Sequence, residues 1–180
     1  MKKPWRQGQF DGLCGAYSIL NAVYYLYHDF SHDDGEKLFA YMVKNNRELF
    51  ADALLNGMGI KQLWTLAHSA KDYLAPARIM NLYRPFHNKK MSSSRAFLDQ
   101  ASTMIGPRAV MVIDLGDPWN HWSVATKITP KTICFRDSET MKRLNRSLLS
   151  LPKKPKLGSL KKSDTKVALE YHCSMVIERQ

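Results

Sequence analysis

Cys14 is the residue with the clearest chemical potential, and it lies in the segment QFDGLCGA at residues 9–16. Apolar residues recur after it at three- and four-residue steps, which predicts a helix over residues 14–27 with one buried face. A cysteine in the first turn of a helix meets unpaired N–H groups and the positive end of the helix dipole, so the thiolate is favoured. Gly15 would let a substrate backbone come close. Cys14 is therefore a candidate nucleophile, although a small buried residue opening a core helix is the alternative interpretation.

The same segment offers donors for an oxyanion hole, which stabilises the charge that develops on a carbonyl oxygen during acyl transfer. The backbone amide of Cys14 is one donor. The side-chain amide of Gln9, a few residues upstream, is the candidate second donor.

His121 and Asp137 are the candidate base and its orienting carboxylate. His121 begins one apolar, β-branched run, and Asp137 follows the next run, with a turn near Pro130 between them. Two antiparallel strands joined by such a turn bring the start of one beside the end of the other. A carboxylate that accepts a hydrogen bond from one ring nitrogen leaves the other nitrogen free for a thiol. Without this pairing, His121 would be merely a histidine on a strand.

The elements that position these residues change in kind along the chain. Helices are predicted over residues 14–27, 34–44, 60–73 and 92–104. Strands are predicted over residues 109–115, 121–128, 132–136 and 167–178, the last of them long enough to be bent or bulged. Helices followed by an antiparallel sheet describe an α+β fold. We expect a single domain over residues 1–180, with a mainly helical lobe at 1–106 and a mainly β-sheet lobe at 107–180.

Composition and cysteine usage limit the class of protein. The chain has 180 residues, of which 44% are hydrophobic and 11% aromatic, so it can bury a core as one globular domain. Its three cysteines lie far apart in the sequence, which disfavours a disulfide framework and favours reduced thiols. No apolar run is long enough for a signal peptide or a membrane span. We therefore expect a cytoplasmic protein, with export by a signal-independent route left open.

The net charge of +11 is concentrated in one stretch, residues 142–166. Prolines and a glycine interrupt this stretch, so we expect a basic loop that is either a solvated insertion or a contact surface for an acidic protein, nucleic acid or anionic lipid. Nucleic acid is the less favoured partner, because the stretch has no aromatic residue on which a base could stack. The expected substrate is a peptide or protein, acidic or ubiquitin-like among the possibilities.

The order Gln, Cys-Gly opening a helix, His-Trp on a strand, and Asp after the following strand resembles papain-like cysteine peptidases. The short form with aspartate is most similar to the peptidases that process bacteriocin leaders at a double glycine, and to their free-standing relatives. The resemblance implies a helical lobe carrying Cys14 and a sheet lobe carrying His121 and Asp137. It also implies cleavage of a peptide or isopeptide bond through a thioester, with no metal and no cofactor. The oxyanion glutamine of these families usually stands six residues before the cysteine, whereas Gln9 stands five before and Gln7 seven before, so both stay open.

Other functions remain as alternatives. The start Asp-Gly-x-Cys at residues 11–14 also resembles ovarian-tumour deubiquitinases, and His-Trp with a later Asp-Ser resembles the SUMO proteases, whose chain order differs. The same scaffold could instead run another acyl transfer, as an amidase or a transglutaminase-like enzyme. A non-catalytic basic binding module is the third class of hypothesis.

Overall fold

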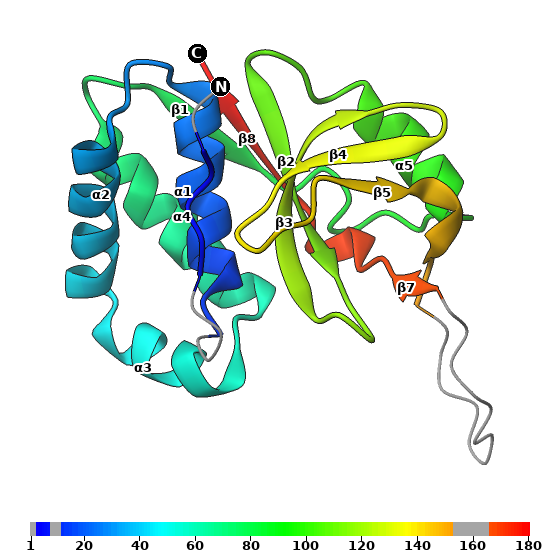
Figure 1. Ribbon diagram of the computed structural model, residues 1–180, viewed down its shortest axis with the longest axis horizontal. Coiled ribbons are helices and arrows are strands. Elements are labelled where there is room, and N and C mark those ends of the chain that lie inside the picture. The colour runs from blue at the N-terminus through cyan, green and yellow to red at the C-terminus, as the bar shows by residue number, and fades with distance from the viewer. Residues whose placement is uncertain (1–2, 8–11, 153–165) are drawn as a thin grey trace.

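Helices occupy one side of the protein and a sheet occupies the other (Figure 1). The structure, a computed structural model, describes residues 3–7, 12–152 and 166–180. Its helices and antiparallel sheet confirm the predicted α+β class. Within the described residues, no helix combines the length and the apolar character needed to cross a membrane.

Four helices form the helical side: α1 (Cys14–Leu26), α2 (His32–Asn45), α3 (Arg47–Asn56) and α4 (Ile60–Leu74). The central one, α1, contacts α2 and α4 as well as β2 and β3 of the sheet. Most of its residues are therefore buried, including polar Ser18 and Asn21. A helix in such a position needs apolar residues on more than one face, and the sequence of α1 supplies them.

Six strands form the main sheet, in the order β1-β8-β2-β3-β4-β5, with every neighbouring pair antiparallel. Their bounds are β1 (Met80–Tyr83), β2 (Ala109–Leu115), β3 (His121–Ile128), β4 (Thr132–Arg136), β5 (Arg143–Asn145) and β8 (Met175–Arg179). A short parallel pair, β6 (Leu149–Ser150) and β7 (Val167–Ala168), makes a second sheet.

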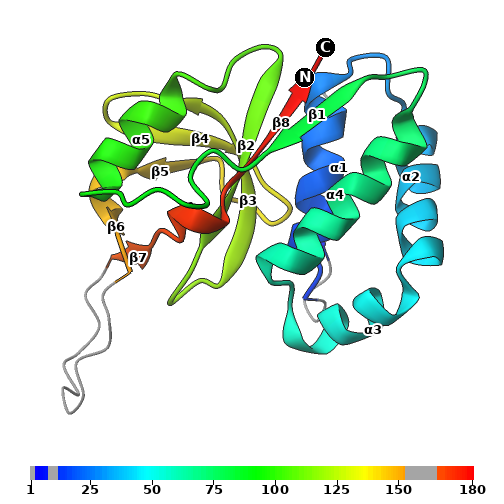
Figure 2. The same cartoon turned by 180° about the vertical axis from the view of Figure 1, so that it is seen from behind.

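The main sheet separates two apolar cores. Successive side chains of a strand point to opposite faces, so Val110 and Val112 of β2 join the core around α1. Met111 and Ile113 join the other core, with residues of α5 (Ser94–Ser102). Figure 2 shows α5 on the part of the sheet that lies away from the other helices. A sheet buried on both faces explains why β2 is an almost continuous apolar run.

Several predicted boundaries are wrong. Residues 47–56 form α3 and residues 80–83 form β1, although neither element was expected. The basic stretch 142–166 is not a plain loop, because β5, the 3₁₀ turn η1 (Arg146–Leu148) and β6 lie in its first nine residues. Its residues 153–165 lie outside the described residues. The expected strand 167–178 is instead β7, the 3₁₀ turn η2 (Tyr171–Cys173) and β8.

Short polar contacts join the helical side to the sheet side. The indole N–H of Trp122 on β3 donates to the Met58 carbonyl, 2.7 Å away, between α3 and α4. The Ser18 hydroxyl of α1 donates to the Trp122 carbonyl at 3.0 Å. Both bonds are buried, so they hold the start of β3 against α1 and against the connection between α3 and α4.

The extended N-terminal segment makes a further connection. Trp5 exchanges two hydrogen bonds with the buried Asn21 side chain, at 2.7 and 3.1 Å. Two residues later, the backbone N–H of Gln7 donates to the backbone carbonyl of Ser138 at 3.1 Å, beyond the end of β4. Residues 5–7 therefore touch both α1 and the sheet side.

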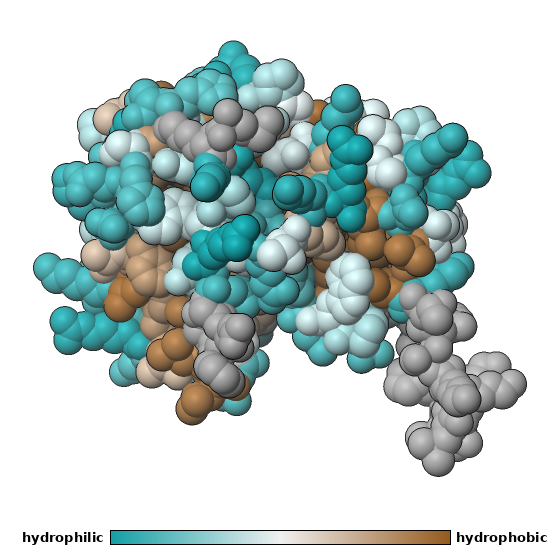
Figure 3. Space-filling model, in the orientation of Figure 1, coloured by the Kyte–Doolittle hydropathy of each residue, from teal (hydrophilic) through white to brown (hydrophobic). Residues whose placement is uncertain are grey.

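The exposed apolar surface is concentrated in a few places. Figure 3 shows apolar surface over α3, where Leu54 and Leu55 are exposed to 45% and 87%. Between the helical side and the sheet, the same view is mainly hydrophilic.

Candidate active site

Cys14 is the first residue of α1 and is buried, with 7% of its surface exposed. The residue before the helix, Leu13, makes no side-chain capping hydrogen bond, and the first turn holds no acidic residue. The N–H groups of a helix's first turn have no partner within the helix, so this end keeps hydrogen-bond donors and a positive potential beside the thiol.

The turn before Cys14 is held by close backbone packing. A Cβ on Gly12 would lie 2.3 Å from the Ala53 carbonyl oxygen, so only glycine fits there without a shift of α3. The Gly12 N–H donates to the Leu54 carbonyl at 3.3 Å. The end of α3, which was not predicted, thus fixes the position at which α1 begins.

Gly15 does not face a substrate site as expected. It is buried, and a Cβ there would meet the sulfur of Met58 at 3.0 Å and Cδ1 of Leu63 at 3.1 Å. Consecutive helical residues point about 100° apart, so the residue next to Cys14 faces the packing contact with α4 instead.

His121 and Asp137 lie side by side where β3 begins and β4 ends. The ring Nε2 of His121 donates to Oδ2 of Asp137 at 2.7 Å. The last pair of β3 with β4 is Val124 with Arg136, so Asp137 directly follows the paired part of β4 and His121 lies three residues before the paired part of β3. The predicted hairpin geometry therefore accounts for their meeting.

Asp137 is almost fully buried and accepts hydrogen bonds on both oxygens. Oδ2 also accepts from the Ser123 hydroxyl at 2.6 Å. Oδ1 accepts from the backbone N–H groups of Glu139 at 2.8 Å and Met141 at 3.4 Å. Burial disfavours the carboxylate, but the bonds from His121 and Ser123 outweigh it, so the pKa of Asp137 lies below its ordinary value.

His121 is placed to hold a positive charge. Burial disfavours its imidazolium form, but hydrogen bonds with Asp137 and with the thiol of Cys14 outweigh this penalty and raise the pKa of His121 to about 10. Since Nε2 is engaged by Asp137, the free nitrogen Nδ1 is the one available to the thiol. Of the three residues predicted to act together, His121 and Asp137 are hydrogen-bonded, and Cys14 is among the groups that act on the His121 ring.

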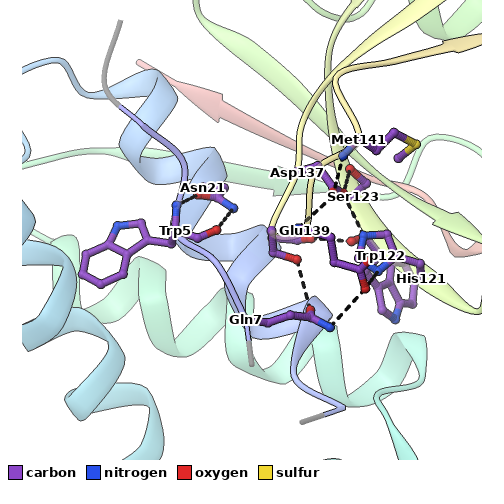
Figure 4. A network of polar contacts seen from close by, with 11 residues as sticks. Trp5, Gln7, Asn21, His121, Trp122, Ser123, Asp137, Glu139 and Met141 are labelled. Carbon is purple, nitrogen blue, oxygen red and sulfur yellow. Dashed lines mark hydrogen bonds and ion pairs between the residues drawn. The ribbon is translucent and has the colours of Figure 1, made fainter. Parts of the chain in front are cut away.

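Three further polar residues surround this group. Ser123 lies two residues after His121, on the same face of β3. Glu139 Oε1 lies 3.7 Å from His121 Nδ1 and accepts from Gln7 Nε2 at 3.4 Å, while Gln7 Oε1 accepts from the Ser138 hydroxyl at 3.0 Å (Figure 4). Period-two spacing from His121 and Asp137 could have indicated Ser123 and Glu139. The contact of Gln7 with residues more than 130 positions away has no signal in the sequence.

Of the two candidate oxyanion glutamines, one lies among the described residues. Gln9, the favoured one, lies outside the described residues. Gln7 lies within them, with its side-chain amide against Glu139, close to the free nitrogen of His121.

A pocket of about 430 Å³ opens beside His121. It is lined by Pro118, Trp119, His121, Asp137, Glu139, Thr140 and Met141.

A neighbouring carboxyl group, Asp114 on β2, has its pKa raised to about 7 by burial and by Glu170, while His121 acts to lower it. Among the residues that the structure describes, no three His, Cys, Asp or Glu side chains are grouped so that they could hold a metal ion.

Comparisons with known proteins return no match: no family model, no curated protein and no solved structure is similar to the chain. The functional conclusion therefore rests on the geometry of the site.

Proposed function

We propose that the chain is a cysteine hydrolase of the papain-like type, in which Cys14 is the nucleophile, His121 the acid and base, and Asp137 a positioning residue. One observation carries the proposal: Cys14 opens a helix and interacts with the His121 ring, whose Nε2 is held 2.7 Å from a buried carboxylate. Nucleophile, base and orienting group in this relation are what thiol acyl transfer requires.

In the proposed first half-reaction, the thiolate of Cys14 attacks the carbonyl carbon of the scissile amide and forms the C–S bond. The carbonyl electron pair moves to oxygen, where the Cys14 backbone N–H stabilises it. As the pair returns, the C–N bond breaks and the leaving nitrogen takes a proton from the His121 imidazolium. The products of this step are an amine and a thioester on Cys14.

In the second half-reaction, neutral His121 removes a proton from water, whose oxygen attacks the thioester. The C–S bond breaks, a carboxylic acid is released, and the thiolate and imidazolium are restored. Asp137 stays ionised throughout and orients the ring, since it accepts from Nε2 and is itself held by three other donors.

The arrangement of the elements supports the papain-like type. The nucleophile opens a helix on the helical side, while the base begins β3 and the carboxylate directly follows the neighbouring strand β4. With this order along the chain, a peptide or isopeptide bond is the proposed substrate, as in the bacteriocin-leader peptidases that the sequence resembles.

The proposal is tested by labelling the intact protein with a mild alkylating reagent between pH 5 and 9 and mapping the modified residue. We expect rapid labelling of Cys14 that persists below pH 7, because the charged His121 ring stabilises the thiolate. The thiol of Cys173 is the internal comparison, since burial and then Asp114 raise its pKa to about 11. Labelling of Cys14 no faster than that of a cysteine in a short peptide would contradict the proposal.

Asp137→Asn should lower kcat/KM about 10²- to 10³-fold, because an asparagine side chain has no negative charge with which to stabilise the His121 imidazolium. The pH above which hydrolysis declines should also fall below about 10, since the carboxylate helps to hold the proton on His121. Both quantities come from pH–rate profiles. Ser123→Ala, which removes one of the donors to Asp137, is the control and should have a smaller effect; an unchanged profile in Asp137→Asn would exclude the positioning role.

Gln7→Ala should lower kcat about 10²-fold, the usual effect of losing one oxyanion donor, with little change in KM. We propose Gln7 as the second donor because its amide lies against Glu139 at the free nitrogen of His121. Gln9→Ala, measured in parallel, is the matched comparison. A larger loss for Gln9→Ala than for Gln7→Ala would assign the role to Gln9 instead.

A further inference from the structure

The pocket beside His121 has a composition that predicts its ligand. Its volume of about 430 Å³ can hold one long side chain. Pro118, Trp119 and Met141 supply apolar surface, and Trp119 is 43% exposed although it is a large aromatic residue. An exposed tryptophan beside a reactive group offers an apolar ring face on which a ligand can pack.

The charge of the pocket is opposite to that of the protein as a whole. The chain carries a net charge of +11, yet none of the described residues that line this pocket is a lysine or an arginine. Its charged groups are Asp137, Glu139 and His121. Asp137 is buried and fully engaged by its donors, whereas the Glu139 side chain is 60% exposed. Glu139 contacts His121 Nδ1 at 3.7 Å and Gln7 Nε2 at 3.4 Å, and its exposed side chain can take a further partner, so it is the group that can pair with a ligand.

A cationic group on an apolar stem matches these two features. Lysine and arginine side chains carry three or four methylene groups that pack on apolar surface while the charged end finds a carboxylate. A tryptophan face adds a cation–π attraction. An acidic ligand would instead face Glu139, and the one cation among the described lining residues is the His121 ring, which the proposed reaction needs for proton transfer.

The position of the pocket identifies which part of a substrate it receives. In the proposed reaction, His121 gives its proton to the leaving nitrogen, so the leaving group lies on the His121 side of Cys14. The pocket is lined by His121 itself, and Glu139 Oε1 lies 3.7 Å from the free Nδ1. A side chain attached next to the leaving nitrogen is thus within reach of both Trp119 and Glu139.

We propose that this pocket binds the basic side chain, lysine or arginine, of the residue that directly follows the scissile bond, with Glu139 pairing to its charge and Trp119 and Met141 packing on its stem. The inference rests on the proposed function and defines the substrate on its leaving-group side.

The test uses the full chain and a pool of peptides randomised on both sides of every bond, with new N-termini identified by mass spectrometry. We expect lysine and arginine to be enriched at the first position of the products from the parent protein. Kinetics on two peptides that differ only there, lysine against norleucine, should show a preference for lysine that falls about tenfold in Glu139→Gln. Glu139→Lys should favour acidic residues at that position. Glu48→Gln, the same change at an exposed carboxylate on α3, is the matched control and should keep the preference for lysine.

The outcomes separate this inference from the proposed function. Cleavage that depends on Cys14 but shows no basic enrichment would overturn the pocket assignment and leave the cysteine hydrolase intact. An equal loss for the lysine and norleucine peptides in Glu139→Gln would assign Glu139 to His121 rather than to substrate, and would also overturn it. Absence of any cleavage that depends on Cys14 would overturn the proposed function, and the leaving-group assignment with it.

Discussion

Cys14→Ala should abolish hydrolysis, with kcat/KM lowered by at least about 10⁴-fold. Removing the nucleophile ends the thioester route, and what remains in such variants is the small contribution of oxyanion donors and binding. The measurement is steady-state hydrolysis of the best peptide from the randomised pool. Purification on a column free of the parent protein is required, because trace contamination would limit the apparent loss.

The structure predicts that Cys14→Ala leaves the fold intact. The change removes one buried sulfur atom at the start of α1, where a small residue still fits, and α1 keeps its contacts with α4 and β3. Thermal unfolding of parent and variant should therefore nearly coincide. Cys134→Ala and Cys173→Ala are the matched controls, since neither thiol has a role in the proposed reaction, and both variants should keep hydrolysis. Equal hydrolysis by Cys14→Ala and the parent would exclude the thiol mechanism.

His121→Ala should lower kcat/KM by a similar factor, at least about 10⁴-fold, because both proton transfers pass through this ring. Labelling of Cys14 by an alkylating reagent should also become slow at neutral pH, and should rise only above about pH 8, as for an ordinary thiol. The two readouts together separate loss of the base from loss of the fold. Labelling at pH 6 that is as fast in the variant as in the parent would exclude His121 as the partner of Cys14.

The pH dependence of the parent protein follows from the same pair. The imidazolium must donate a proton to the leaving amine, and it exists only below the pKa of His121, which is about 10. Hydrolysis should therefore hold up to about pH 10 and decline above it. Groups facing His121 from other elements are Asp137, Cys14, Glu139 and Asp114, and Asp114 has a pKa of about 7. Asp114→Asn is the control, and it should remove any inflection near pH 7 without removing the decline near pH 10.

The strands that carry the site were predictable because their local signals agree with their tertiary setting. β2, β3 and β4 have the predicted bounds, since each is a β-branched or apolar run ended by turn residues. The proximity of His121 and Asp137 needed only one hairpin, so it could be inferred from strand order.

Other elements depend on contacts that no local pattern reveals. α3 buries only Phe50 and Ala53, so its amphipathic pattern is weak. Its start also has no side-chain cap that would mark the beginning of a helix. The expected strand 167–178 is interrupted because Val167 and Ala168 pair in parallel with β6, while β8 pairs with both β1 and β2. Such pairing is decided by partners far away in the sequence.

The same distinction applies to the site. Cys14, His121 and Asp137 could be named because each opens or ends a regular element. Gln7 could not, since its contacts are with residues more than 130 positions away in the sequence. Which pocket residues gather beside His121 likewise depends on the loops after β2 and β4.

The short segment of residues 5–7 belongs to no helix or strand, yet it is hydrogen-bonded to Asn21 of α1 at one end and to Ser138, next to Asp137, at the other. The nucleophile and its base stand on different sides of the molecule, so their separation depends on how firmly those sides are joined. Removing this segment would take the Trp5 ring off the helical core and loosen the alignment between thiol and imidazole. Proteolysis near the N-terminus would therefore act on the reaction through the distance between the two sides of the protein.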